Sequence, residues 1–180
     1  MPTTSSFSAA PGASAEPLSA AELLFPDFAA EHATTRRFLE RFPESRSEWR
    51  PHERSRTLAQ LATHIAAIPL RGAVILTTDE LDLATSRPSA PLTSAAELVA
   101  RHAANVAQLE AALVRTDLAT LSGDWVFRNG SQVLVRGPRR LLLRVMMMSH
   151  LVHHRAQLGV YYRLLGLPVP GTYGPSADEG

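Results

Sequence analysis

The stretch RLLLRVMMMSHLVHHRAQLGVYYRLLGL, residues 140–167, decides the fold of this 180-residue chain. Its apolar residues recur at helical spacing, which predicts one long helix. His150 and His154 are four residues apart, so on a helix they lie one above the other on a single face. The same face carries apolar residues that would turn toward a core: Leu143, Met147, Leu151 and Leu158. Two buried imidazoles need partners, and a divalent metal ion is the simplest one that satisfies both.

Three further segments upstream show helical spacing of apolar residues. They are residues 18–42, residues 58–81 behind a Ser55 or Thr57 cap, and residues 94–113. Pro26 forms a first turn or a kink in the first segment. Pro69 must bend or divide the second, because proline lacks the N–H that a helix interior uses. The fourth helix opens at Pro138, and Gly166 closes it.

The only convincing strand signal lies between the third and fourth helices. Residues 125–127 and 133–135 flank Asn129-Gly130, a favoured hairpin turn. Four helices of comparable length without an internal repeat predict an all-α fold, an antiparallel four-helix bundle with a small β-hairpin between helices 3 and 4. The long loops leave room for a crossover connection in place of simple up-and-down order.

Composition and charge narrow the class of protein. The net charge is +1, and this balance argues against nucleic-acid or anionic-membrane binding. No apolar run approaches the roughly 18 residues of a membrane span. Cysteine is absent, which excludes disulfides, thiolate metal ligands and a cysteine nucleophile. Any thiol chemistry therefore needs a thiol from a small molecule.

Length and the N-terminal composition set the domain organisation. Residues 19–180 fit a single domain with a proper core. Residues 1–18 are rich in Ser, Ala and Pro, which predicts a disordered tail. This end has no basic flank and no continuous apolar core, so it does not resemble a signal peptide, and we expect a cytoplasmic protein.

A third imidazole completes the candidate metal site. His64 lies one turn from Leu61 and Ile68 on the second helix, so it also faces inward. The competing interpretation is that these are satisfied core or surface histidines, since a chance pair four apart is expected in about a quarter of shuffled sequences. Three imidazoles leave coordination positions for water or substrate, as in catalytic sites. Zinc, nickel and iron all accept imidazole.

The other histidines fit this site poorly. His153 would diverge from its neighbour by about 100° on a helix, so we assign it to the flank or surface. We expect His32, His52 and His102 to face solvent or to be hydrogen bonded. Glu31 is either a carboxylate that holds a water near the site or a solvated charge.

Three separated stretches resemble the DinB-like family, which is unrelated to the DNA polymerase of that name. They are HLVHHRAQLGVYYRLLGLPVPGTYGPSADE at residues 150–179, WRPHERSRTLAQLATHIAAIP at 49–69 and EHATTRRFLERFPE at 31–44. The first carries the family's H-x-x-x-H-R-x-Q pattern. The resemblance covers roughly residues 20–179.

This resemblance implies a four-helix bundle that binds zinc or nickel through His64, His150 and His154. The wider superfamily includes YfiT-like proteins, which are metal-dependent transferases that use mycothiol or bacillithiol. Members are often homodimers. The resemblance thus implies a divalent metal, a small-molecule thiol as a candidate cosubstrate and a second copy of the chain as partner.

Arg155 and Gln157 occupy the R and Q of the pattern. Gln157 could orient a ligand or a bound water, and Arg155 could hold a carboxylate in a bidentate contact. Alternatively, Arg155 pairs with a helix carboxylate and Gln157 packs at a helix contact. The residues alone do not choose between these alternatives.

The sequence thus supports three functions. The first is a metal-dependent enzyme that activates water or a small-molecule thiol, as a hydrolase or thiol S-transferase in stress or detoxification. The second is a non-catalytic, stress-responsive, metal-binding dimeric bundle. The third is a dimerising bundle whose histidines are only polar core residues.

Overall fold

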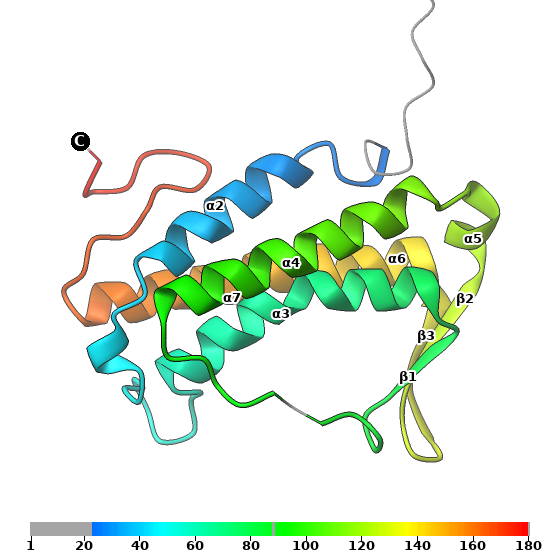
Figure 1. Cartoon of the computed structure of the whole chain (residues 1–180), viewed down its shortest axis with the longest axis horizontal. Coiled ribbons are helices and arrows are strands. Elements are labelled where there is room, and N and C mark those ends of the chain that lie inside the picture. Colours follow the sequence, from blue (N-terminus) through cyan, green and yellow to red (C-terminus); the bar gives the residue numbers. More distant parts are fainter. Residues whose placement is uncertain (1–22, 88, 180) are drawn as a thin grey trace, which may run out of the picture.

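The computed structural model describes residues 23–87 and 89–179, and this part of the chain is mostly helical with a small sheet (Figure 1). The predicted tail, residues 1–18, lies outside the described residues, as does the start of the first predicted helix. The longest helices are α2 (Phe28–Glu40), α3 (Leu58–Thr77), α4 (Ala95–Val114) and α7 (Ser149–Leu164). The predominance of helix agrees with the sequence-based prediction.

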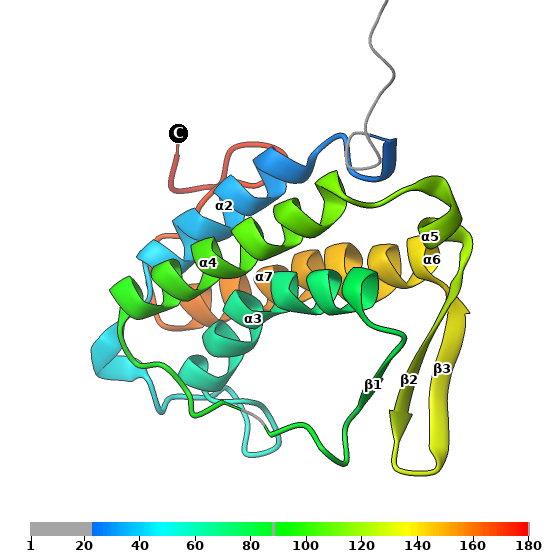
Figure 2. The same cartoon turned by 45° about the vertical axis from the view of Figure 1, so that its right-hand side comes forward.

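The helix directions differ from the predicted antiparallel order. In Figures 1 and 2, α3 and α4 run in the same direction, while α2 and α7 run the opposite way. Residues 78–94 carry the chain from the end of α3 back to the start of α4. The crossover that the long loops allowed is therefore present, and α3 and α4 form the most extensive helix contact.

The sheet contains a strand that periodicity missed. Its order is β1 (Glu80–Asp82), β2 (Asp124–Asn129) and β3 (Gln132–Pro138), with β1 parallel and β3 antiparallel to β2. Residues 80–81 were expected to end the second helix. Instead, Arg128 of β2 pairs with Glu80 at 2.5 Å and with Asp82 at 2.9 Å. These contacts between distant segments favour a strand there.

The β2–β3 turn is shifted by one residue from the expected Asn-Gly pair. The two-residue loop is Gly130-Ser131, and Gly130 has a φ of 58°. Among the described residues no non-glycine has a positive φ, so the positive value falls at the first central position alone. Glycine at that position is typical of a type II′ turn, whose twist suits a hairpin.

Local sequence signals set the beginning of α3. Thr57 and Gln60 form a capping box, with Gln60 N donating to Thr57 Oγ1 at 3.2 Å and Thr57 N donating to Gln60 Oε1 at 2.9 Å. Thr57, not Ser55, is therefore the cap. The helix continues through Pro69 without division.

The end of α3 depends on a distant side chain. The Arg139 guanidinium donates to the carbonyls of Ile75 and Thr78, both at 2.9 Å. Such contacts satisfy carbonyls that a helix C-terminus leaves without partners. The same group donates to Asp124 O at 2.9 Å, so Arg139 ties α3 to the start of β2.

The predicted long fourth helix contains a wider turn. It runs as α6 (Arg139–Leu143), the π-helical segment η2 (Arg144–Met148) and α7. Beyond α7, Gly166 has a φ of 70°, Gly166 N donates to Arg163 O, and Leu167 N donates to Tyr162 O. This is a Schellman motif, so Gly166 closes the helix as predicted.

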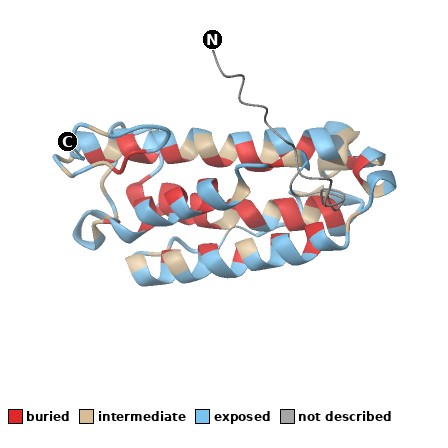
Figure 3. Ribbon diagram, turned by 90° about the horizontal axis from the view of Figure 1, so that it is seen from above, coloured by how far each residue is buried: buried red, intermediate tan, exposed pale blue. Residues whose placement is uncertain are grey.

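The core lies between the helices. Figure 3 shows the buried residues facing inward and the exposed residues facing outward. The side chains at the centre include Leu61, Ile65, Leu109, Met147 and Leu158, each 0–1% exposed. By length and composition α3 is apolar enough to cross a membrane, but most of it is buried among the other helices.

The capping box gives a test of the fold. Thr57→Ala removes the side-chain acceptor of Gln60 N, so we expect it to lower the free energy of unfolding by about 1 kcal/mol. Ser55→Ala is the matched control, and it should change the stability by a few tenths of a kcal/mol or less. Urea denaturation measures both. Equal losses in the two variants would contradict Thr57 as the cap.

Candidate metal centre

Three imidazoles from two helices meet at one place. His64 comes from α3, while His150 and His154 come from successive turns of α7. One nitrogen of each ring lies within 4.8 Å of the corresponding atoms of the other two, and the Nε2 atoms of His64 and His150 are 2.9 Å apart. The three rings also lie edge to face, with centroids 4.4–5.1 Å apart. The structure thus assembles the cluster that the sequence predicts.

The imidazoles lie at the edge of the core, not inside it. Leu151 and Leu158 of α7 are fully buried, whereas His150 and His154 are half-buried. The inward-facing position expected for the histidine pair is therefore only partly correct. Positions 150 and 151 diverge by about 100° on a helix, so the histidines flank the apolar stripe. The cluster is therefore partly exposed to solvent.

Burial keeps the three imidazoles neutral. It lowers the pKa of His64 to about 3 and that of His150 to about 4, and the nearby positive charges of Arg56 and Arg71 act in the same direction. The pKa of His154 is also lowered, chiefly by burial. A neutral imidazole has one nitrogen lone pair available for a metal ion. The cluster is therefore in the binding-competent protonation state at neutral pH.

A hydrogen bond selects the tautomer of His154. Its Nδ1 lies 2.7 Å from Oε1 of Gln157. A carbonyl oxygen can only accept, so Nδ1 carries the proton and Nε2 keeps its lone pair. Metal-binding histidines almost always donate their second ring N–H to a fixed oxygen in this way.

The donor set fits a divalent transition metal. Zinc–imidazole bonds of about 2.0–2.1 Å with tetrahedral angles place ligand nitrogens about 3.3 Å apart. The His64 and His150 nitrogens, at 2.9 Å, are close to that separation, and all three nitrogens lie within 4.8 Å of one another. Three protein ligands are the number found in catalytic zinc sites, where the fourth position is left for water or substrate.

Arg155 points away from the imidazoles. It is 2% exposed, and its guanidinium pairs with the Glu31 carboxylate of α2 at 2.6 Å and also donates to Glu31 O at 3.0 Å. A further N–H donates to the Tyr173 hydroxyl at 3.2 Å. Of the two alternatives for Arg155, the geometry therefore agrees with pairing to a helix carboxylate. Glu31 is 3% exposed, so it is not a solvated charge.

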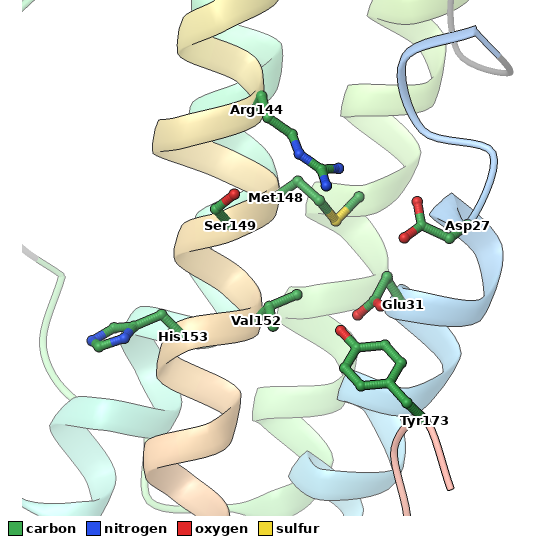
Figure 4. Close-up of a pocket in the computed structure, with 8 residues that line it drawn as sticks. All are labelled: Asp27, Glu31, Arg144, Met148, Ser149, Val152, His153 and Tyr173. Carbon is green, nitrogen blue, oxygen red and sulfur yellow. The ribbon is translucent and has the colours of Figure 1, made fainter.

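Glu31 lines a separate cavity between α2 and α7. The cavity has a volume of about 290 Å³, and Figure 4 shows Asp27, Glu31 and Tyr173 on one side of it. His153 also lines this cavity, but its side chain points away from these three residues and is exposed, which agrees with its predicted surface position. None of the three imidazoles of the cluster lines the cavity.

His32 and His102 were expected to face solvent or to be hydrogen bonded, and both expectations are wrong. They are 6% and 3% exposed, and their rings lie 5.3 Å apart between α2 and α4. No ring nitrogen of either makes a hydrogen bond with a residue that the structure describes. Burial lowers the pKa of His32 to about 3 and that of His102 to about 4. His52 is exposed and accepts from Arg54 N at 3.2 Å.

Helical spacing contains a signal for one of these buried histidines. His102 follows Leu98 by four residues on α4, and Leu98 is fully buried. Residues four apart share a face, so the apolar stripe already indicates burial of His102. Arg56 and Arg71, whose charges act on the histidine cluster, carry no comparable signal in the sequence.

Comparisons with known proteins identify the fold family. The sequence model of the DinB family matches residues 18–180. A DinB-like protein from Bacillus subtilis has 18% identity and a TM-score of 0.64, over 83% of this chain and 96% of that one. A DinB-like protein from Bacillus cereus has 21% identity and a TM-score of 0.63, over 84% and 97%. No match is found among curated proteins.

The cluster gives a prediction for metal binding. His150→Ala or His154→Ala leaves two imidazoles, so we expect binding of zinc or nickel to be abolished, and His64→Ala to weaken it strongly. His153→Ala should retain it, because this exposed ring lies outside the cluster. Equilibrium dialysis with elemental analysis of untagged protein measures the stoichiometry. Equal loss in the His153 and His154 variants would show that the assigned ligands are wrong.

The buried His32–His102 pair gives a prediction for pH dependence. Because the folded-state pKa values lie below the usual 6.5, the unfolded chain binds these protons first as the pH falls. Their effect on stability is absent above about pH 6.5, and stability falls between that pH and about 4. Each such histidine adds a slope of about 1.4 kcal/mol per pH unit within this range.

His102→Leu should reduce the slope of the unfolding free energy against pH by about 1.4 kcal/mol per pH unit, the contribution of one proton. Urea denaturation from pH 4.5 to 7.5 measures this slope. The exposed His52→Leu is the control and should leave the slope unchanged. An unchanged slope in His102→Leu would show that this imidazole is not held neutral by burial.

Proposed function

This chain belongs to the DinB family, and on that premise we propose that it is a metal-dependent enzyme whose His64, His150 and His154 bind one divalent metal ion. The convergence of three neutral, half-buried imidazole nitrogens is the observation that carries this proposal. Zinc and nickel suit these ligands best, and iron also accepts imidazole.

Each residue of the site has a distinct task in this proposal. His64 on α3 and the histidine pair on α7 supply nitrogen lone pairs from opposite sides of the α3–α7 contact. Gln157 holds the Nδ1 proton of His154 and so directs Nε2 toward the cluster. Partial burial keeps the imidazoles unprotonated at neutral pH without sealing the site from solvent.

The reaction class follows from the donor set and from composition. A divalent metal held by three imidazoles acts as a Lewis acid, which acidifies a coordinated water or thiol and polarises a carbonyl. The chain has no cysteine, so a thiol nucleophile must come from a small molecule. We therefore propose hydrolysis, or transfer of a small-molecule thiol onto an electrophile, as the activity.

Purified, untagged protein tests this proposal in two steps. The first is metal content, where we expect one divalent ion per chain. The second is a screen of the loaded protein with esters, amides and thiol–electrophile pairs. We expect turnover that is lost on chelation and lost in His154→Ala, with His153→Ala as the active control.

The two steps separate the competing functions. Stoichiometric metal without turnover across the screen would favour a metal-binding protein without catalytic activity. Absence of stoichiometric metal in the folded protein would overturn the proposal and leave the histidines as polar residues at the edge of the core.

A further inference from the structure

Two arginines lie on either side of the histidine cluster along α3. Arg71 follows His64 by seven residues, which is two helical turns and the same side of the helix. Arg56 directly precedes the Thr57 cap, and its carbonyl accepts a hydrogen bond from the Tyr161 hydroxyl at 3.2 Å. Tyr161 in turn follows His154 by seven residues on α7. Both arginines are thus tied to the helix sides that carry the imidazoles.

The helices that carry the imidazoles bring positive charge and no negative charge to this region. Neither α3 nor α7 contains an acidic residue, and Arg71 is the only charged residue of α3. Three neutral imidazoles bring no negative charge to a metal ion either. A dication bound here would therefore add to a positive field that an anionic ligand would relieve.

Neither guanidinium makes an ion pair or a hydrogen bond with a residue that the structure describes. Several other arginines of the fold do: Arg128 pairs with Glu80 and Asp82, Arg155 with Glu31, and Arg163 with Asp178. Those arginines are held by acidic side chains, whereas the two beside the cluster keep their donors available.

Arg71 is the more informative of the two. It is half-buried, and burial together with the charge of Arg56 lowers its pKa from the usual value. Its guanidinium carbon lies 5.9 Å from the ring centroid of Phe127 on β2, within cation–π range. The small sheet thus provides a wall on which this guanidinium rests. Partial burial without a carboxylate partner is costly, and binding an anion offsets that cost.

We propose that the metal centre takes a small anionic substrate, whose carboxylate or phosphate group is bound by Arg71 and Arg56 while its reacting atom lies at the open position beside His64, His150 and His154. This inference rests on the proposed function, because it assigns a substrate class to the same site. Guanidinium groups suit it, because their planar donors match the oxygens of carboxylate and phosphate. The two arginines bind and position the substrate, and the imidazoles hold the metal.

Cobalt-loaded, full-length protein tests the inference without any assay of turnover. The visible spectrum of Co²⁺ reports changes at its open position, so titration with acetate, with inorganic phosphate and with uncharged imidazole gives three dissociation constants at low salt. Arg71→Gln and the exposed Arg56→Gln should each weaken anion binding about tenfold. Both should leave the cobalt stoichiometry and the imidazole affinity unchanged.

Arg101→Gln on α4 is the charge-matched control. Arg101 is exposed and lies on α4, which carries none of the three imidazoles, so its loss should leave anion binding nearly unchanged. The tighter of acetate and phosphate identifies the preferred anionic group. If Arg56→Gln and Arg71→Gln both bind anions as tightly as the control does, the inference is wrong, but the proposal that the cluster binds a metal is unaffected. If folded wild-type protein takes up no cobalt, the proposed function fails and this inference fails with it.

Discussion

The contact between α3 and α7 is the constraint on which the candidate site depends. His64 is 86 residues from His150 in sequence, and only the packing of these two helices brings their Nε2 atoms to 2.9 Å. Buried apolar residues on both helices hold the contact, including Leu61, Ile65 and Leu158. The imidazoles lie at the margin of this apolar contact. Burial there lowers their pKa values enough to keep them neutral, and the rings remain partly exposed to solvent.

α7 carries the histidine cluster on one side and a buried ion pair on another. His154 points to the half-open cluster, and its neighbour Arg155 points into the interior, where it pairs with Glu31. Successive helical residues diverge by about 100°, so adjacent positions of one motif serve different purposes. The H-x-x-x-H-R-x-Q pattern therefore combines residues of the histidine cluster with an arginine that fastens α7 to α2. Gln157 returns to the histidine side and supports His154.

The small sheet connects the fold with the site. Arg139 fastens the end of α3 to the start of β2, and Phe127 of β2 lies under the Arg71 guanidinium. After α3, β1 pairs with β2, and the chain then crosses back to the start of α4. Because of this crossover, α3 and α4 run in the same direction. The sheet thus contacts both the end of α3 and Arg71, the residue two turns from His64.

Several features depend on short-range spacing along the chain and were predictable from the sequence. These are the four helical regions, Thr57 as one of two candidate caps, the stop at Gly166 and the i, i+4 histidine pair. Tertiary structure alone decided the rest: the β1 strand, the π-helical turn, the inward direction of Arg155 and the burial of His32. Spacing along the chain fixes which side chains share a face. Whether that face packs in the core, lies at its edge or contacts a distant arginine depends on contacts between segments far apart in sequence. Local periodicity does not predict those contacts.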